Sequence, residues 1–244
     1  MVSLLRKATH IALDQVFPLQ CIACNTYGFA LCSNCAQLAE PVPPTICLTC
    51  GRPQFEQVAS CLPCQQLDLI QDEPTLLFSR SATLFTSPIR EAVHGLKYEK
   101  RTELASILAR YLFASFRCYP WIDLYSLIDA VTPVPLHAQR LADRGYNQAG
   151  LIAESFSKYV KIPFAPNLLE RSQNTDSQVG KSIAERQQNV ANAFRATTRL
   201  DDLVILLIDD VCTTGATLHA SAQALKDAGA LEVYALTLAT PQVR

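Results

Sequence analysis

Two adjacent carboxylates, Asp209 and Asp210, stand between a run of aliphatic residues and a short stretch of small and hydroxyl-bearing residues at 213–217. Small residues let a phosphate group approach the backbone closely, and the start of a helix attracts anions. Two carboxylates would repel that phosphate, so they need a different partner, such as sugar hydroxyls or a magnesium ion. The combination indicates a site for a phosphorylated sugar. The alternative is an ordinary strand whose two aspartates only begin a turn.

The residues around this motif predict a strand, a loop, a helix and a second strand. Residues 203–208 form an uncharged apolar run, which is typical of a central strand in a parallel sheet. Apolar residues recur at helical spacing across 218–228, Gly229 is placed to end that helix in a left-handed conformation, and 231–238 reads as the next strand. Because open α/β sheets bind ligands where their strands end, we expect both aspartates at such an end and outside the core.

A second predicted strand end carries the opposite charge. Residues 128–134 read as another parallel strand that ends at Pro133 and Pro135. The loop expected beyond it contains Arg140 and Arg144, whose guanidinium groups can bind phosphate through paired hydrogen bonds. These arginines predict a pyrophosphate clamp, and a solvated basic loop is the alternative.

Eight of the ten cysteines form four C-x-x-C pairs, at Cys21/Cys24, Cys32/Cys35, Cys47/Cys50 and Cys61/Cys64. Two cysteines three residues apart can hold one metal ion from a tight turn, and two such pairs complete a tetrahedral site with no open position. We therefore expect two structural zinc sites, with Gly51 turning the chain through positive φ. A thioredoxin-like redox couple lacks the strand-then-helix context that it requires, and the spacings suit an iron–sulfur cluster less well. Pairing in sequence order is the simplest arrangement, and interleaved pairing stays open.

The composition of the 244-residue chain excludes several classes of protein. Apolar residues make up 49% and charged residues 18%, which is enough for a substantial core and argues against global disorder. The net charge of −1 differs from the basic balance of a dedicated nucleic-acid-binding domain. The sequence shows no signal peptide and no apolar run long enough to span a membrane, so we expect a cytoplasmic protein.

Three more helices are expected. Residues 89–101 carry five basic side chains opposite an apolar stripe, forming either a solvated face or a patch for anions or nucleic acid: Arg90, His94, Lys97, Lys100 and Arg101. Residues 102–117 form a second helix that Thr102 can cap, and Cys118 is expected to be a small core residue. Residues 147–160 form the third helix.

The stretch 208–217, which reads IDDVCTTGAT, resembles the 5-phosphoribosyl-1-diphosphate (PRPP) binding motif of the type I phosphoribosyltransferases. The resemblance implies an α/β fold of that type, with a parallel sheet and flanking helices. It implies that Asp209 and Asp210 contact the ribose hydroxyls and that magnesium accompanies PRPP. It also implies that a single loop cradles the 5-phosphate, namely Thr213, Thr214, Gly215, Ala216 and Thr217.

The polar residues 171–182 have no periodicity, which predicts a mobile loop or β-arm. Ser182 and Glu185 then form a capping box for a helix that reaches Phe194. In phosphoribosyltransferases a flexible loop closes over the diphosphate and excludes water, and the resemblance assigns that part to 171–182.

A second motif follows the strand that ends before Leu136: from Arg140 the sequence has the pattern R-x-x-x-RGYNQA. This motif resembles that of the ComF family, also called the GntX or competence protein F family. The cysteine pairs match the N-terminal double zinc ribbon of that family, and the resemblance extends to Leu238. We therefore divide the chain into an N-terminal helix at 1–20, a double zinc ribbon at 21–66 and a phosphoribosyltransferase-like domain at 67–244.

Members of the ComF family are implicated in natural transformation and in handling single-stranded DNA. The resemblance thus implies a phosphoribosyltransferase in DNA uptake, with PRPP as substrate and single-stranded DNA and competence proteins as partners. Asp209, Asp210 and Arg144 would be catalytic, and Arg140 with Arg144 would steady the leaving pyrophosphate. The sequence does not identify the acceptor. The alternatives are a non-catalytic PRPP sensor and an adaptor that binds nucleic acid or protein.

Overall fold

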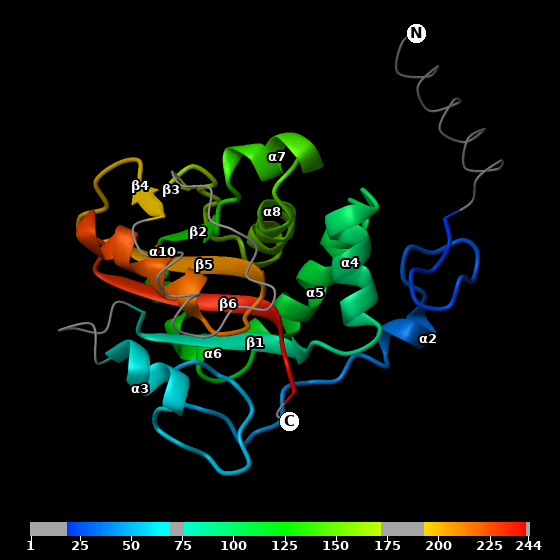
Figure 1. Ribbon diagram of the computed structural model, residues 1–244, viewed down its shortest axis with the longest axis horizontal. Coiled ribbons are helices and arrows are strands. Elements are labelled where there is room, and N and C mark those ends of the chain that lie inside the picture. Colours follow the sequence, from blue (N-terminus) through cyan, green and yellow to red (C-terminus); the bar gives the residue numbers. More distant parts are fainter. Residues whose placement is uncertain (1–18, 69–75, 172–192, 243–244) are drawn as a thin grey trace, which may run out of the picture.

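The computed structural model describes residues 19–68, 76–171 and 193–242. At its centre lies a four-stranded sheet in the order β1-β6-β5-β2, and every neighbouring pair runs parallel (Figure 1). The strands are β1 (Phe78–Leu84), β2 (Ala130–Pro133), β5 (Val204–Val211) and β6 (Glu232–Thr240). The predicted α/β class, with a parallel sheet and flanking helices, is confirmed.

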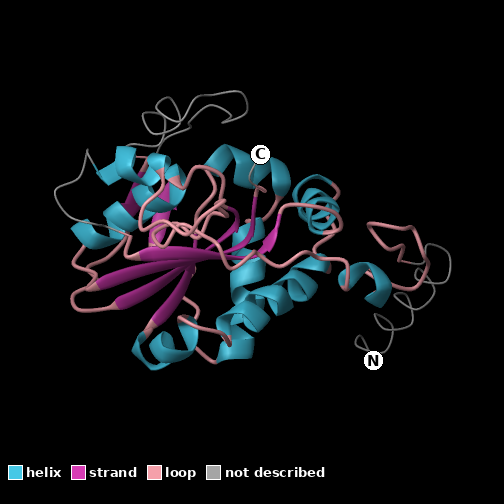
Figure 2. Ribbon diagram, turned by 90° about the horizontal axis from the view of Figure 1, so that it is seen from below, coloured by secondary structure: helices cyan, strands magenta, loops and turns pink. Residues whose placement is uncertain are grey.

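Helices cover both faces of this sheet (Figures 1 and 2). On one face lie α4 (Ile89–Tyr98), α5 (Leu104–Phe116) and α8 (Gln148–Val160), and on the other lies α10 (Ala216–Asp227). The short α6 (Trp121–Leu124) and the 3-10 helix η1 (Tyr125–Leu127) lead from α5 to β2. Gly229, with φ of +100°, follows α10 in the left-handed conformation that the sequence predicts. None of the described helices combines the length and the apolar character needed to cross a bilayer.

The central strand β5 is buried over Val204–Ile208, as expected for a strand that is covered on both faces. Successive side chains of a strand point to opposite faces. Leu206 and Ile208 therefore join the apolar cluster under α5 and α8, whereas Ile205 and Leu207 join the cluster under α10. The register pairs Ile208 with Pro133, so the ends of β5 and β2 lie side by side.

Two predicted features fall wholly or largely outside the described residues. They are the N-terminal helix at 1–20 and the loop and helix expected across 171–194. The two ends of the second segment are described, and there β3 (Leu169–Arg171) pairs antiparallel with β4 (Phe194–Ala196). The prediction that a helix reaches Phe194 is wrong, because this residue begins a strand and pairs with Arg171.

The cysteine-rich segment contains two knuckles, which carry the short helices α2 (Ser33–Ala36) and α3 (Leu62–Asp68). The first knuckle, at 21–35, shares one apolar cluster with α4 and α5. A Cβ atom on Gly95 of α4 would lie 3.0 Å from Ile22, so the two segments approach each other closely. The second knuckle, at 47–64, lies along the outer edge of β1, where the Ser79 N–H donates to the Thr49 carbonyl at 2.8 Å.

Three local predictions need correction. The expected loop with Arg140 and Arg144 contains a helix, α7 (Ala138–Arg144), which His137 caps and left-handed Gly145 ends. None of its seven residues is buried, so the sequence showed no apolar stripe that could have predicted this helix. The side chain of Thr102 makes no cap, because α5 begins after Glu103 with no capping hydrogen bond from a side chain. Cys118 is exposed and does not belong to the core, because it follows the end of α5.

Substitution of Phe156 can test the packing of α8 on the sheet. Its side chain is fully buried, and its ring lies edge-on to Phe116 with ring centroids 5.3 Å apart. We expect Phe156→Ala to lower the free energy of unfolding by about 3–5 kcal/mol, because it removes a buried ring and leaves a cavity. Urea unfolding measures this change. Lys158→Ala on the exposed side of the same helix is the control, with an expected change of about 0.5 kcal/mol or less. Equal changes in the two variants would contradict the packing described here.

Candidate functional site

The two aspartates lie within the last part of β5, which continues to Val211. Because neighbours on a strand point to opposite faces, Asp210 faces α4 and α8 while Asp209 faces the other side. Asp210 is only 4% exposed, and Asp209 is half-buried. The expectation that both lie outside the core is therefore wrong for Asp210. The backbone N–H of Asp210 donates to Asp209 Oδ1 at 2.8 Å, which fixes the Asp209 carboxylate against its own strand.

A lysine from another helix neutralises the buried carboxylate. The Nζ atom of Lys97, in the last turn of α4, forms an ion pair with Asp210 Oδ2. Sequence reasoning placed Lys97 on an exposed basic face and missed this role. A buried carboxylate needs a cation, but because Asp210 was expected outside the core, nothing in the sequence was a reason to pair it with any of the five basic residues.

The first residue of α8 contacts the same carboxylate. Gln148 Nε2 lies 3.5 Å from Asp210 Oδ1, and Arg144 Nη1 donates to Gln148 Oε1. Asn147 holds Gln148 in place, because its side chain caps α8 at the Ala149 N–H and donates to the Val134 carbonyl at 2.9 Å. Arg144, Gln148, Asp210 and Lys97 thus form one polar chain across the end of the sheet.

The two carboxylates differ in how readily they take up a proton. Burial alone would raise the pKa of Asp210, but the charge and hydrogen bond of Lys97 outweigh burial and hold this pKa below the ordinary value. At Asp209, burial and then the negative charge of Asp210 raise the pKa well above the ordinary value. Asp210 is therefore ionised and can only accept hydrogen bonds, whereas the carboxyl group of Asp209 can also donate one. This combination suits a ligand rich in hydroxyl groups.

The segment 213–217 forms the turn between β5 and α10. Gly215, with φ of +83°, caps α10 in a left-handed conformation that disfavours residues with a side chain. Thr214 Oγ1 lies 3.4 Å from the Ala216 N–H, at the point where α10 begins. The helix dipole adds partial positive charge at this end. The structure thus places the predicted phosphate loop, Thr213 to Thr217, at a helix N-terminus that directly follows the two aspartates.

Arg140 and Arg144 lie four residues apart on α7 and are near neighbours along one side of this helix. With residues of α4 and the turn after it, they line a cavity of about 420 Å³, whose lining is Lys97, Tyr98, Lys100, Arg140, Asp143 and Arg144. The guanidinium of Arg144 lies 5.7 Å from the centre of the Tyr98 ring. Both predicted arginines therefore share a cationic cavity with Lys97, which connects it to Asp210.

Arg171, at the end of β3, is a further basic residue near the site. Burial lowers its pKa first, the charge of Arg140 lowers it further, and the charge of Asp209 opposes both effects. Its charge therefore interacts with both Arg140 and Asp209. Sequence reasoning included Arg171 only as the first residue of the loop at 171–182 and gave it no role of its own.

The five basic residues predicted to share one face are divided among different partners. Arg90 pairs with Glu91, and Arg101 pairs with Glu103 and also donates to the Gln20 carbonyl. Lys97 turns inward to Asp210, whereas Lys100 lines the cationic cavity. Arg90, His94 and Lys100 are exposed, as the solvated interpretation expects, whereas Lys97 and Lys100 line the cationic cavity, so the five residues do not share one role.

The eight paired cysteines form two tetrads in sequence order, Cys21/Cys24/Cys32/Cys35 and Cys47/Cys50/Cys61/Cys64. Within each tetrad all sulfur atoms lie within 4.8 Å of one another, and individual Sγ–Sγ separations are 3.6–4.0 Å. Four thiolates at about 2.3 Å from one tetrahedral zinc ion would be about 3.8 Å apart, so both tetrads fit zinc. The order of pairing is thereby settled, and Gly51 has the predicted positive φ of +66°.

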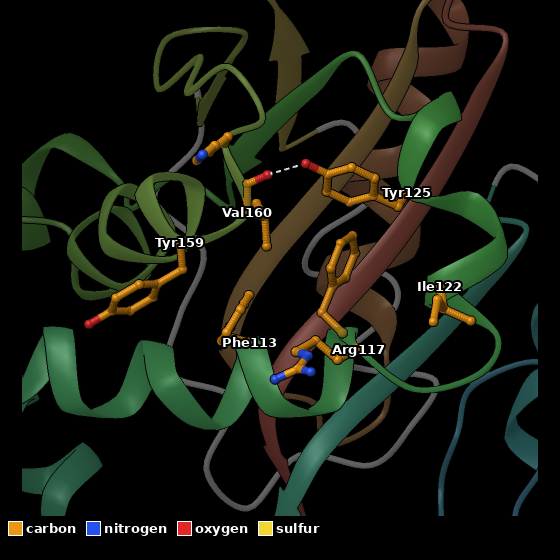
Figure 3. A pocket seen from close by; sticks show the side chains of 8 residues that line it. Phe113, Arg117, Ile122, Tyr125, Tyr159 and Val160 are labelled. Atoms are coloured by element: carbon orange, nitrogen blue, oxygen red, sulfur yellow. Dashed lines mark hydrogen bonds between the residues drawn. The ribbon is translucent and has the colours of Figure 1, made fainter.

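A second cavity lies away from this site, at the C-terminal ends of α5 and α8. Its volume is about 470 Å³, and it is lined by Phe113, Phe116, Arg117, Ile122, Tyr125, Tyr159, Val160 and Lys161 (Figure 3). Tyr125 uses its hydroxyl to donate to the Val160 carbonyl at 2.6 Å. Aromatic carbon dominates this cavity, and none of the predicted site residues lines it. The chemistry therefore concentrates at the end of β5.

Comparison with known proteins agrees with this arrangement. Residues 141–243 match the family model of the phosphoribosyl transferase domain, and residues 12–65 match that of the double zinc ribbon domain. The first match contains the aspartates and the phosphate loop, and the second contains both cysteine tetrads.

Relatives align along most of the chain. Competence protein F of Haemophilus influenzae is 28% identical over 91% of this chain and 97% of the relative. Competence protein ComFC of Bacillus subtilis is 29% identical over 85% of this chain and 83% of the relative. DNA utilization protein YhgH of Escherichia coli is 30% identical over 85% of this chain and 90% of the relative. The chain therefore belongs to the competence protein F family and contains a double zinc ribbon domain and a phosphoribosyl transferase domain.

Proposed function

We propose that this protein binds PRPP at the end of β5 and transfers its phosphoribosyl group. One observation carries the proposal: an ionised carboxylate, Asp210, is held beside a phosphate-type loop at a helix N-terminus and beside a cationic cavity. These three features complement the three parts of PRPP, which are the ribose hydroxyls, the 5-phosphate and the diphosphate. A phosphorylated sugar without a diphosphate would place no second anionic group at the cationic cavity.

Each part of the site has a role in this proposal. Asp209 and Asp210 accept hydrogen bonds from the ribose hydroxyls, and residues 213–217 surround the 5-phosphate. Arg140 and Arg144 stabilise the negative charge that develops on the leaving diphosphate. Lys97 adds positive charge at the junction between ribose and diphosphate. Magnesium, when bound with PRPP, would neutralise part of the diphosphate charge, and Asp209 would hold it only in its ionised form, because Lys97 already pairs with Asp210.

A sensor function is the second candidate, and the Lys97–Asp210 ion pair favours it. A ribose hydroxyl that binds Asp210 has to compete with Lys97 and Gln148, which already contact both carboxylate oxygens. Binding of PRPP would then rearrange α4 and the start of α8. Such a rearrangement could be transmitted to a partner without turnover.

The names of the relatives place them in competence and DNA utilization. We therefore propose that this protein also acts in DNA uptake, with single-stranded DNA as partner or acceptor and competence proteins as further partners. Tyr98, on the rim of the cationic cavity, is 66% exposed, and Tyr27 on the first knuckle is 63% exposed. Exposed aromatic rings are suited to stack on unpaired bases, and Tyr98 also has the basic side chains of the cavity beside it.

The division into an N-terminal helix at 1–20, a double zinc ribbon at 21–66 and a phosphoribosyltransferase-like domain at 67–244 is retained as part of the proposal. The two matched family models, at 12–65 and 141–243, lie on either side of the second boundary. Zinc is the proposed occupant of both tetrads, because two complete tetrathiolate sets leave no position for a substrate.

The first test measures PRPP affinity. Titration calorimetry with magnesium and PRPP should show binding to the wild-type protein, and Asp210→Asn should weaken it at least about tenfold, or about 1.4 kcal/mol. Lys158→Gln, on the exposed face of α8, should leave the affinity unchanged. Because asparagine at 210 leaves the half-buried Lys97 without its partner, the double variant Asp210→Asn/Lys97→Gln controls for folding. Wild-type affinity in a folded Asp210 variant would refute the assignment of this carboxylate.

Pyrophosphate release from the same samples then separates the two candidate functions. Release that depends on added single-stranded DNA is expected for a transferase that acts on DNA. Release of pyrophosphate with an added nucleobase, but not with single-stranded DNA, would support the transferase and contradict DNA as the acceptor. Binding of PRPP with no release under either condition would contradict transfer and support the sensor.

The second test concerns the metal sites. We expect mass spectrometry of the purified protein to find two zinc ions per chain. Cys24→Ser and Cys50→Ser should each reduce the content to about one ion, because each variant removes one ligand from a different tetrad. Cys118→Ser is the matched control and should retain two ions, since Cys118 belongs to neither tetrad. Iron in place of zinc, or loss of metal from the control, would contradict the assignment.

A further inference from the structure

We propose that Arg52, which projects from the second cysteine knuckle, is a positioning residue for the phosphate loop. Its guanidinium donates a hydrogen bond from Nη2 to the backbone carbonyl of Thr213, a residue 161 positions later in the chain. The zinc ribbon would thereby form part of the phosphate site. The identification of the ligand as PRPP rests on the proposed function, but the effect of Arg52 on the loop does not.

The contact fixes the direction of one peptide group. A trans peptide holds its C=O and its N–H on opposite sides. When the Thr213 carbonyl points to Arg52, the N–H of Thr214 must point away from the ribbon. That N–H belongs to the loop that precedes α10, where an anion would bind. Arg52 therefore sets the orientation of a donor that the phosphate would meet.

The loop is already fixed on both sides of this peptide. On the strand side, the Cys212 N–H donates to the Ala239 carbonyl at 2.9 Å, and the Cys212 side chain is buried. On the helix side, Gly215 has its left-handed conformation and α10 begins at the next residue. Thr213 and Thr214 lie between these two points. Arg52 supplies the contact that holds them from outside the sheet.

Arg52 itself is carried by a rigid turn. The Gly51 N–H donates to the Cys47 carbonyl and the Cys47 N–H donates to the Arg52 carbonyl, both at 2.9 Å, so the backbone around Arg52 belongs to the knuckle. Gly51 lies directly against β1, because a Cβ atom there would be 2.6 Å from the Ser79 carbonyl oxygen. Zinc held by Cys47 and Cys50 would brace this turn from the inside.

Two side chains of β1 bind the same turn. Ser79 Oγ donates to the Cys50 carbonyl at 3.0 Å, and Arg80 Nη1 donates to the Leu48 carbonyl at 2.8 Å. The second knuckle therefore cannot shift along β1 without breaking these contacts. Since β1, β6 and β5 belong to one sheet, the base of Arg52 and the phosphate loop are connected to the same rigid support.

Hydrogen exchange of the ligand-free protein tests the inference directly. We expect Arg52→Ala to accelerate exchange of the amides at 213–217 at least fivefold, with β5 and β6 unchanged. Arg52→Lys keeps a charged donor of nearly the same reach and should retain most of the protection, whereas the amide of Arg52→Gln is neutral and too short to reach the Thr213 carbonyl and should lose it. Arg199→Ala is the matched control, because Arg199 is an exposed arginine paired with Asp201 near the other end of β5. Unchanged exchange in Arg52→Ala and Arg52→Gln, with two zinc ions retained, would overturn the proposal.

The zinc content and the PRPP affinity of each variant complete the experiment. A variant that keeps both zinc ions and shows faster loop exchange should bind magnesium-PRPP about tenfold more weakly. If the wild-type protein does not bind PRPP, the proposed function fails, yet the exchange result still decides the role of Arg52. If Arg52→Ala loses zinc, the comparison of Arg52→Lys with Arg52→Gln decides it: equal loop exchange in these two would overturn the proposal.

Discussion

The buried carboxylate of Asp210 imposes the strongest constraint on this structure. An ionised group that is 4% exposed has to be neutralised by a partner, and here the partner comes from a helix that lies far away in the sequence. The ion pair with Lys97 fixes the end of α4 over β5, and Gln148 fixes the start of α8 on the other side of the same carboxylate. Asp210 thus positions α4, which borders the cationic cavity, and the start of α8, whose Gln148 accepts a hydrogen bond from Arg144 of the cavity.

The zinc ribbon contributes to the same arrangement, because its two knuckles support different walls. The first knuckle packs into the apolar cluster behind α4, the helix that carries Lys97. The second knuckle lies on β1 and extends Arg52 to the loop that follows β5. A short segment with few long apolar runs would depend on bound zinc for its own fold. The same segment contacts both sides of the candidate ligand site.

Much of the fold could be predicted from the sequence where local patterns are long and uniform. The apolar run before Asp209, the helical spacing after Thr217 and the four cysteine pairs each specify one local structure, and the structure agrees with all three. The interpretation failed where the deciding contact is distant in sequence. Lys97 looked like one of several surface cations, because its partner lies on another element. The contact between Arg52 and Thr213 also had no local signal, and α7 is too short and too exposed to show an apolar stripe.

The position of β1 has a consequence for how the chain is made. Among the described strands, β1 pairs only with β6, the last strand of the chain, while Glu40 and Thr49 of the cysteine-rich segment bind its outer edge. On the ribosome, β1 therefore emerges long before its strand partner exists, and an unpaired strand edge invites aggregation. The cysteine-rich segment is synthesised first and can cover one edge of β1 during that interval. The N-terminal ribbon would then keep one edge of β1 covered in the nascent chain until β6 pairs with the other edge.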